Sequence, residues 1–237
     1  IPRSLSGSAL DGLDGDRTLA TGPTVLADLR IGSTGDGIVV AGATDPRLEN
    51  VSVRSVSDVA LTLGAIEERG GDARVTGARI VGGEYVDSRD GIAVVLATDT
   101  RIEGVTVQNN DDAGIRLGSG GVLQPVPESG GEIAVQERRP FPSTVVDTTV
   151  VGSTVAGNSL GVLAFDADGV TLRGVVVEEN SRVGAQFLGG SDVLVDETRV
   201  RSNGAGIVFD RGLEGGVTGA VVRDSASVRN VPQGEFG

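Results

Sequence analysis

The sequence predicts an all-β fold, a single-stranded right-handed parallel β-helix with about eight rungs of about 22 residues. Pairs of apolar residues five positions apart recur along the chain, and a glycine often follows the first member by two positions. A second, alternating apolar pair lies further along each repeat, as in Ile115/Leu117. The recurrent pairs are Leu26/Ile31, Leu48/Val53, Val75/Ile80, Ile102/Val107, Val150/Val155, Leu172/Val177, Val195/Val200 and Val217/Val222.

Each repeat contains three short apolar runs that alternate with period two, and Gly, Asn or Asp separates one run from the next. No segment has the 3.6-residue period that an amphipathic helix requires. A single rung cannot bury its apolar side, so the stack of rungs is the folding unit. We therefore expect a linker or cap over residues 1–23, the β-helix over 24–229 and a tail over 230–237.

Two sets of residues recur at the same point of successive repeats and predict ladders inside the stack. Asparagine tolerates the positive φ angle that a corner requires, and its amide can bond to the amides above and below. Phenylalanines spaced by 22 residues are expected to stack on one another. The predicted ladders are Asn110, Asn158, Asn180 and Asn203, and Phe165, Phe187 and Phe209.

The repeat is interrupted between Ile102 and Val150, where the step is 48 residues. Residues 119–144 contain two alternating runs around a Glu-Ser-Gly-Gly turn, which predicts an inserted β-hairpin arm. Pro125 and Pro127 fit an edge strand of such an arm. An additional irregular rung is the alternative. An arm would cover a groove or contact another subunit.

A four-residue extension over residues 82–91 brings polar side chains to one corner, next to the acidic corner of the following rung. Because adjacent rungs are about 4.8 Å apart, carboxylates of the two corners can lie about 5 Å apart. That spacing suits acid/base work on a sugar or a shared calcium ion. The candidate catalytic residues are Asp87, Asp90, Asp111 and Asp112, and the candidate substrate-binding residues are Tyr85, Arg89 and Arg116. The alternative is a solvated acidic corner without a ligand.

The composition excludes several classes of function. The formal net charge of −13 disfavours a nucleic-acid partner, and no apolar stretch is long enough for membrane insertion. The absence of His and Cys rules out Ser-His-Asp and Cys-His catalysis and makes a zinc site unexpected, and without Met a copper site is unexpected too. All 20 basic residues are Arg, and with the acidic charge this indicates a halophilic, archaeal or viral, source. A high-GC codon bias, which also replaces Lys by Arg, is the alternative.

The segments TRIEGVTVQNNDDAGIRL (residues 100–117) and VTLRGVVVEENSRVGAQF (170–187) resemble the right-handed β-helix repeat family, which includes NosD-like and pectate-lyase-like proteins. The resemblance covers residues 24–229 and implies the fold. Its enzyme branch implies action on polysaccharides, with calcium and a basic residue in pectate-lyase-like proteins. The pair Asp111-Asp112 resembles the double Asp of polygalacturonase-like proteins. Their Gly-His-Gly and Arg-Ile-Lys motifs are missing, as is the Asp-Pro-His-Asp motif of alginate-epimerase-like proteins.

These observations favour a non-catalytic extracellular or surface-associated scaffold or binding module that recognises carbohydrate. Its expected partners are a polysaccharide or neighbouring surface-protein subunits, and its expected place is outside the cell, on the cell surface or in a virion tail fibre. The alternative is a polysaccharide lyase or glycoside hydrolase that acts on an acidic polysaccharide through the Asp cluster. No cofactor is established by the sequence, and calcium is compatible with it.

Overall fold

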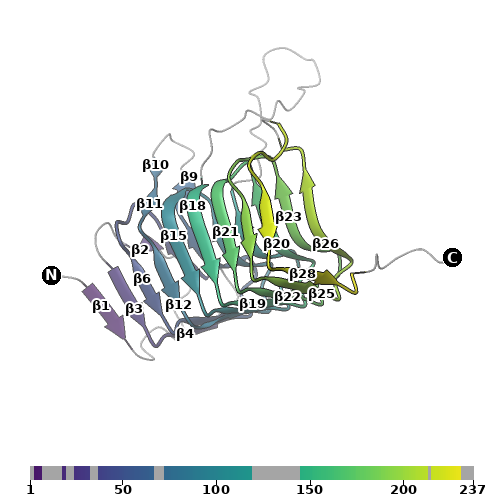
Figure 1. Ribbon diagram of the computed structural model, residues 1–237. Helices are drawn as coiled ribbons and strands as arrows, with labels where there is room; N and C mark the ends of the chain where they lie inside the picture. The colour runs from purple at the N-terminus through teal and green to yellow at the C-terminus, as the bar shows by residue number, and fades with distance from the viewer. Residues whose placement is uncertain are drawn as a thin grey trace, which may run out of the picture.

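The computed structural model describes residues 3–6, 18–19, 24–32, 37–66, 72–118, 145–212 and 215–230. These residues form an all-β parallel β-helix, which confirms the predicted fold class. Figure 1 shows the rungs stacked along one axis, with the chain advancing steadily from the N-terminal to the C-terminal end. None of the described segments forms a helix, and so none offers a helix that could cross a membrane.

The rungs contribute their strands to three sheets, and all pairs within these sheets are parallel. The first sheet contains β1 (Arg3–Ser6), β3 (Thr24–Ala27), β6 (Arg47–Glu49), β12 (Arg79–Val81), β15 (Ala97–Glu103), β18 (Val145–Val151), β21 (Asp168–Arg173), β24 (Leu194–Asp196) and β27 (Val221–Arg223), with β11 (Val75–Thr76) beside β15. The second contains β4 (Arg30–Gly32), β7 (Ser52–Arg54), β13 (Glu84–Val86), β16 (Thr106–Gln108), β19 (Thr154–Ala156), β22 (Val176–Glu178), β25 (Arg199–Arg201) and β28 (Ala226–Val228). The third contains β2 (Thr18–Leu19), β5 (Ile38–Val40), β8 (Val59–Leu63), β14 (Asp90–Val94), β17 (Ala113–Leu117), β20 (Leu160–Phe165), β23 (Val183–Leu188) and β26 (Ala205–Asp210).

The core is a set of aliphatic columns that run along the stack. In the first sheet the inward column passes through residues that pair with one another on successive strands, and all but its last member are buried. These residues are Leu26, Leu48, Ile80, Ile102, Val150, Leu172, Val195 and Val222. Burial of branched apolar side chains without Trp or Met therefore supplies the hydrophobic free energy of the stack.

Two of the predicted pairs are shifted by five residues. The inward residues of the third rung are Ile80 and Tyr85, not Val75 and Ile80, because Ile80 pairs with both Leu48 and Ile102. The last rung is shifted in the same way, since Val222 pairs with Val195. The step from Leu48 to the next inward residue thus becomes 32 residues, and the following step becomes 22.

The extra residues of that long step lie after β8, not at residues 82–91. β9 (Ala65–Ile66) and β10 (Asp72–Ala73) pair antiparallel and form a hairpin outside the three parallel sheets. The predicted arm at residues 119–144 and the predicted tail, apart from Asn230, lie outside the described residues. Within the predicted linker or cap, β1 pairs with β3 and β2 pairs with β5, so these two strands extend the parallel sheets.

The asparagine ladder is confirmed. The amide Nδ2 of each Asn donates to Oδ1 of the Asn on the next rung, at 3.0 Å from Asn110 to Asn158, 3.0 Å from Asn158 to Asn180 and 2.9 Å from Asn180 to Asn203. The same oxygens accept the backbone N–H of the preceding Asn. Asn230 extends the ladder by one rung. The side-chain amides of the four buried asparagines thus bond to one another, to Asn230 and to nearby backbone groups.

The phenylalanine ladder is confirmed for one pair and wrong for the third member. The rings of Phe187 and Phe209 stack with centroids 5.2 Å apart. Phe165 pairs with Leu188, and Ala164 occupies the inward position opposite Phe187. The corner after Asn180 is one residue longer than the corner after Asn158, and this single residue moves Phe165 to the outer face.

Candidate functional site

The structure places Tyr85 in the core. Its side chain points inward on β13, between Val53 of β7 and Val107 of β16, and is fully buried. Burial raises the pKa of the phenol far above its usual value of about 10. Its hydroxyl has no hydrogen-bond partner among the described residues. The expected role of Tyr85 as a stacking platform for substrate is therefore wrong, because the ring is inaccessible to any ligand.

Asp90 is also buried, at the start of β14, and is held by charge partners on its own and the next rung. Its Oδ1 accepts the backbone N–H of Ala113 at 3.0 Å, and its Oδ2 lies 2.9 Å from Nη2 of Arg116. Arg89 lies 3.8 Å from the same oxygen and 2.5 Å from Asp58. These contacts join neighbouring strands and occupy the carboxylate of Asp90. Arg89 and Arg116 are thus its ion-pair partners and are not free anchors for a substrate.

The other three candidate carboxylates remain at the surface. Asp87, Asp111 and Asp112 are exposed corner residues, and the backbone N–H of each donates to a carbonyl of a neighbouring rung. Asp87 adopts a φ of 56°, as corner residues of this fold commonly do. No group of three or more acidic side chains is arranged to hold a metal ion in the described part of the chain. The structure therefore brings together Arg89, Asp90 and Arg116, but it does not show Asp87, Asp111 and Asp112 converging with them.

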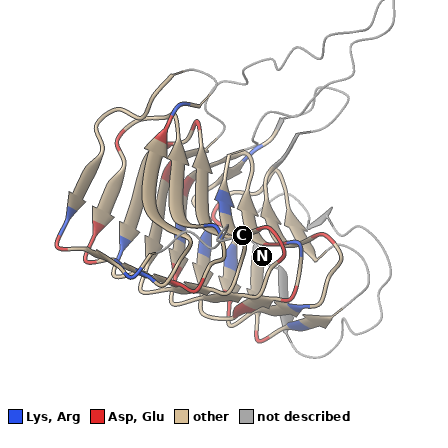
Figure 2. Ribbon diagram, turned by 90° about the vertical axis from the view of Figure 1, so that its right-hand side faces the viewer, with Lys and Arg blue, Asp and Glu red and all other residues tan. Residues whose placement is uncertain are grey.

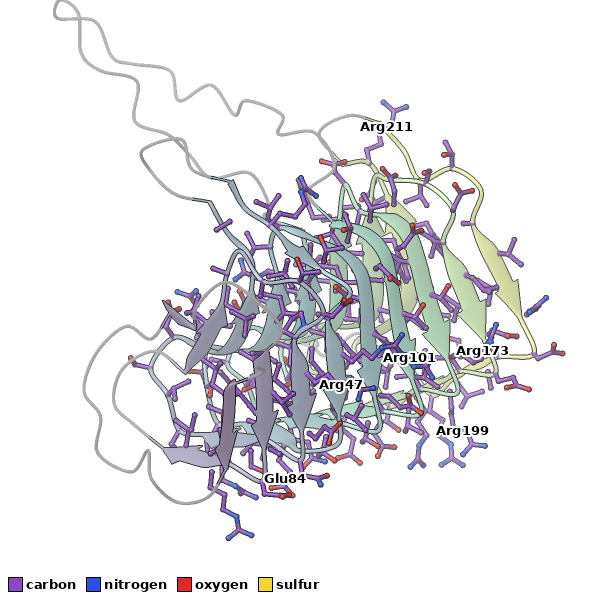
Figure 3. The ribbon with its side chains drawn as sticks, turned by 90° about the vertical axis from the view of Figure 1, so that its left-hand side faces the viewer. Arg47, Glu84, Arg101, Arg173, Arg199 and Arg211 are labelled. Carbon is purple, nitrogen blue, oxygen red and sulfur yellow. The ribbon has the colours of Figure 1, made fainter. Side chains whose placement is uncertain are left out.

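A different charged surface, which the sequence analysis missed, covers the first sheet. Two outward rows flank the inward column of this sheet, and they carry five arginines, which we call the arginine face. Figure 3 shows Arg47, Arg101 and Arg173 following one another along this side of the molecule. In Figure 2 the charged residues lie mainly near strand ends and corners. The arginine face consists of Arg47, Arg79, Arg101, Arg173 and Arg223, and the acidic residues in the same rows are Glu49, Glu103 and Asp196.

The first three arginines stand on successive strands, β6, β12 and β15. Arg47 lies 3.9 Å from Glu49, and Arg101 lies 2.8 Å from Glu103. Arg79 has Val81 at the position where its neighbours have glutamate, and it has no acidic partner among the described residues. The centre of this stripe is therefore an exposed guanidinium with unused donors.

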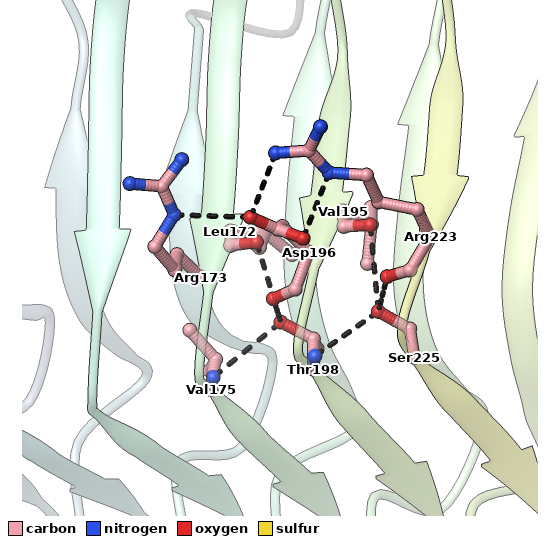
Figure 4. A network of polar contacts seen from close by, with 8 residues as sticks. All are labelled: Leu172, Arg173, Val175, Val195, Asp196, Thr198, Arg223 and Ser225. Atoms are coloured by element: carbon pink, nitrogen blue, oxygen red, sulfur yellow. Dashed lines mark hydrogen bonds and ion pairs between the residues drawn. The ribbon is translucent and has the colours of Figure 1, made fainter.

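At the other end of the arginine face, Arg173 and Arg223 both bind the carboxylate of Asp196. Asp196 accepts Arg223 Nε at 2.9 Å and Nη2 at 3.1 Å, and it accepts Arg173 Nε at 3.1 Å from the other side (Figure 4). Hydrogen bonds and charge from Arg223, followed by those from Arg173, lower the pKa of Asp196. The carboxylate thus stays ionised, and the three side chains together carry one positive charge.

The sequence did hold a signal for this surface. An arginine directly precedes the inward residue in Arg47-Leu48 and Arg101-Ile102, and alternation along a strand requires such a residue to face outward. The outward positions of successive repeats therefore contain the stripe of arginines in the sequence itself.

No protein-family model and no curated protein matches the chain. Among solved structures, the periplasmic alginate epimerase AlgG aligns with a TM-score of 0.59 at 11% identity, over 84% of this chain and 51% of its own. The A-module of the mannuronan C-5 epimerase AlgE4 from Azotobacter vinelandii aligns with a TM-score of 0.52 at 12% identity, over 100% and 87%. PfbA, a surface adhesin of Streptococcus pneumoniae, aligns with a TM-score of 0.52 at 9% identity, over 86% and 60%.

The chain thus spans about half the length of the periplasmic epimerase. At identities of 9–12% these likenesses show the fold alone, a right-handed parallel β-helix.

Proposed function

We propose that this protein is a non-catalytic carbohydrate-binding module whose ligand is an acidic polysaccharide lying along the arginine face. The observation that carries the proposal is the stripe of Arg47, Arg79 and Arg101 on three successive strands, with Arg79 unpaired among the described residues. The solved structures that share the fold include two epimerases named for alginate or mannuronan and a surface adhesin, which agrees with this ligand class and with a place outside the cell.

The spacing of the stripe suits a repeating anion. Parallel strands are about 4.8 Å apart, so an extended chain along the stacking axis meets a guanidinium on each of the three rungs of the stripe. Arginine presents a planar fork of donors that matches a carboxylate. A single exposed ion pair contributes only about 0–1 kcal/mol, so affinity depends on several contacts being made by one chain.

The negative net charge of the protein does not prevent this interaction. Charges more than about 8–10 Å away are largely screened at physiological salt, so the ligand responds mainly to the local face. Duplex DNA carries about one charge per 1.7 Å and therefore meets a much stronger repulsion from the rest of the surface than a chain with one carboxylate per sugar.

Several features support binding without catalysis. The carboxylates of Asp90 and Asp196 are each held by arginines, so neither is available as an acid or base. The sequence contains no His and no Lys. We also place neighbouring surface-protein subunits among the partners.

Affinity electrophoresis and calorimetry with polygalacturonate and alginate, against neutral dextran, test the proposal. We expect both acidic polymers, but not dextran, to bind, and binding to weaken as salt rises. Arg79→Ala should weaken binding about twofold to fivefold, and the triple variant Arg47→Ala/Arg79→Ala/Arg101→Ala should abolish it. The matched control is Arg199→Ala, an exposed arginine on β25 of the second sheet. Equal effects of Arg79→Ala and Arg199→Ala would overturn the assignment of the face.

The catalytic alternative is tested with the same polymers. Prolonged incubation with calcium, at low and high salt, should release no unsaturated products and no reducing ends. Release that is lost in Asp112→Asn would instead establish a lyase or hydrolase.

A further inference from the structure

A hollow lies next to the arginine face, at the turns that connect the first sheet to the second. The hollow has a volume of about 750 Å³ and opens over the N-terminal rungs. This volume is in the range of small-molecule sites, which is about 300–1,000 Å³. The hollow is lined by Asp28, Arg30, Asn50, Ser52, Arg54, Gly83 and Glu84, and thus by residues of β4, β7 and β13 and of the turns before them.

The sequence of the corner explains why a hollow forms at this level. On the first two rungs the corner residues are Asp28 and Asn50, which have φ angles of 52° and carry side chains, and Asn50 Nδ2 lies 3.4 Å from Asp28 Oδ1. On the third rung the corner is Gly82-Gly83. A Cβ on Gly83 would lie 2.0 Å from the carbonyl oxygen of Val51, so this position excludes a side chain. The side chains of Asp28 and Asn50 therefore line one side of the hollow, and next to them the glycine corner leaves space that no side chain fills.

One of the two arginines in the hollow has an acidic partner and the other has none among the described residues. Arg54 of β7 forms an ion pair with Glu84 of β13, and this pair spans two rungs. Arg30 of β4 is exposed and has no acidic partner among the described residues. Ser52 lies between Arg30 and Glu84 in the same outward row. The hollow thus offers one free guanidinium, surrounded by a carboxylate, an amide and a hydroxyl.

We propose that this hollow binds a single carboxylated sugar, a hexuronate, with Arg30 holding the carboxylate and Asp28, Asn50 and Ser52 bonding the ring hydroxyls. The chemistry matches group by group. An unpaired guanidinium prefers a planar carboxylate, and carboxylate and amide oxygens accept from hydroxyl donors. The ligand class rests on the proposed function, whereas the site is separate from the arginine face. A chain bound on that face could place an end or branch here.

Titration calorimetry and ligand-observed NMR test the site with galacturonate, glucuronate and mannuronate, and with galactose as the neutral counterpart of the first. We expect at least one hexuronate to bind at millimolar concentration and galactose to bind at least tenfold more weakly. Arg30→Ala should weaken hexuronate binding at least tenfold. Ser52→Tyr, which fills the hollow and keeps every charge, should do the same.

Arg199→Ala is the matched control, because Arg199 occupies the same outward row of the second sheet several rungs away from Glu84 (Figure 3). Arg199→Ala should bind the hexuronates with an affinity within twofold of that of the unchanged protein. Absence of binding by all three hexuronates, or equal binding by Arg30→Ala and Arg199→Ala, would overturn the inference. If acidic polymers still bind and depend on Arg79 in that case, the proposed function stands and only the hollow is wrong. If the polymers do not bind either, both fail.

Discussion

Replacing Asn158 by alanine tests whether the asparagine ladder holds the stack together. Asn158 Oδ1 accepts the backbone N–H of Asn110 at 2.9 Å and its Nδ2 at 3.0 Å, and Asn158 Nδ2 donates to Asn180 Oδ1 at 3.0 Å. The variant leaves the N–H of Asn110 without an acceptor in a buried site, at a cost of about 1–3 kcal/mol. The two lost amide bonds add about 0.5–1.5 kcal/mol each. We therefore expect a loss of about 2–6 kcal/mol in the free energy of unfolding.

Urea unfolding and hydrogen exchange at the Asn110 amide measure this loss globally and locally. The matched control is Asn230→Ala, because Asn230 makes the same two contacts to Asn203 but lies half-buried in the last described rung. Water can replace its amide there, so the control should cost about 1 kcal/mol or less. The reasoning fails if both variants unfold at the same urea concentration and the Asn110 amide keeps its protection.

Three further predictions concern single residues. Tyr85, the chain's only tyrosine, should show no tyrosinate absorbance while the protein is folded. Because its pKa is raised in the folded state, stability should be unaffected below pH 10 and fall by about 1.4 kcal/mol per pH unit well above it, as followed by urea unfolding. Asp196→Asn should lower the urea midpoint at pH 7. Since the folded pKa of Asp196 is lowered, that difference should shrink below pH 4 and vanish once the carboxyl protonates in the folded protein. Gly161→Ala should lower the free energy of unfolding by about 3 kcal/mol, because the added Cβ would lie 2.3 Å from the carbonyl oxygen of Gly184. The control Gly152→Ala, whose Cβ would have nothing within 4 Å, should lower it by about 1 kcal/mol because of the φ of 54° at that position. Thermal unfolding measures both.

The inward pattern was predictable because burial acts directly on residue type. Val, Leu and Ile recur where the chain faces the core, and asparagine recurs where a buried corner needs both a donor and an acceptor. The apolar requirement repeats along the whole stack, and the asparagine recurs on the successive rungs from Asn110 to Asn230, so both patterns are detectable in a single sequence.

The position of the extra residues was not predictable from the apolar pairs. The longer strands of the first sheet contain a second inward residue five positions before the main one, as in Ala97/Ile102 and Val145/Val150. A residue with positive φ, such as Asp99 or Asp147, makes this odd spacing possible by inserting one extra residue into the alternation. The same five-residue spacing therefore occurs twice in a rung, and the sequence alone does not distinguish the two.

The expected position of the candidate site depends on which of the two five-residue spacings marks the inward pair of the third rung. Shifting the third rung by five residues moves Tyr85 from a supposed loop into the second sheet and places Asp90 at the start of β14. Tyr85 and Asp90, which the sequence placed at a surface corner, are therefore buried. Charge partners such as Arg116 for Asp90 are 26 positions away in sequence, so only the stacking of rungs reveals them.

The asparagine ladder also protects its own members from chemical ageing. An asparagine followed by glycine or serine deamidates when the next backbone nitrogen attacks its side-chain amide, and Asn203-Gly204 and Asn180-Ser181 are such pairs. Here the nitrogen of Gly204 donates to the carbonyl of Asn180 at 3.0 Å, and that of Ser181 donates to Asn158 at 2.8 Å. Both nucleophiles are directed toward the neighbouring rung, and the amides are held by the next asparagine. Such a stack can therefore keep reactive sequences intact for as long as it stays folded.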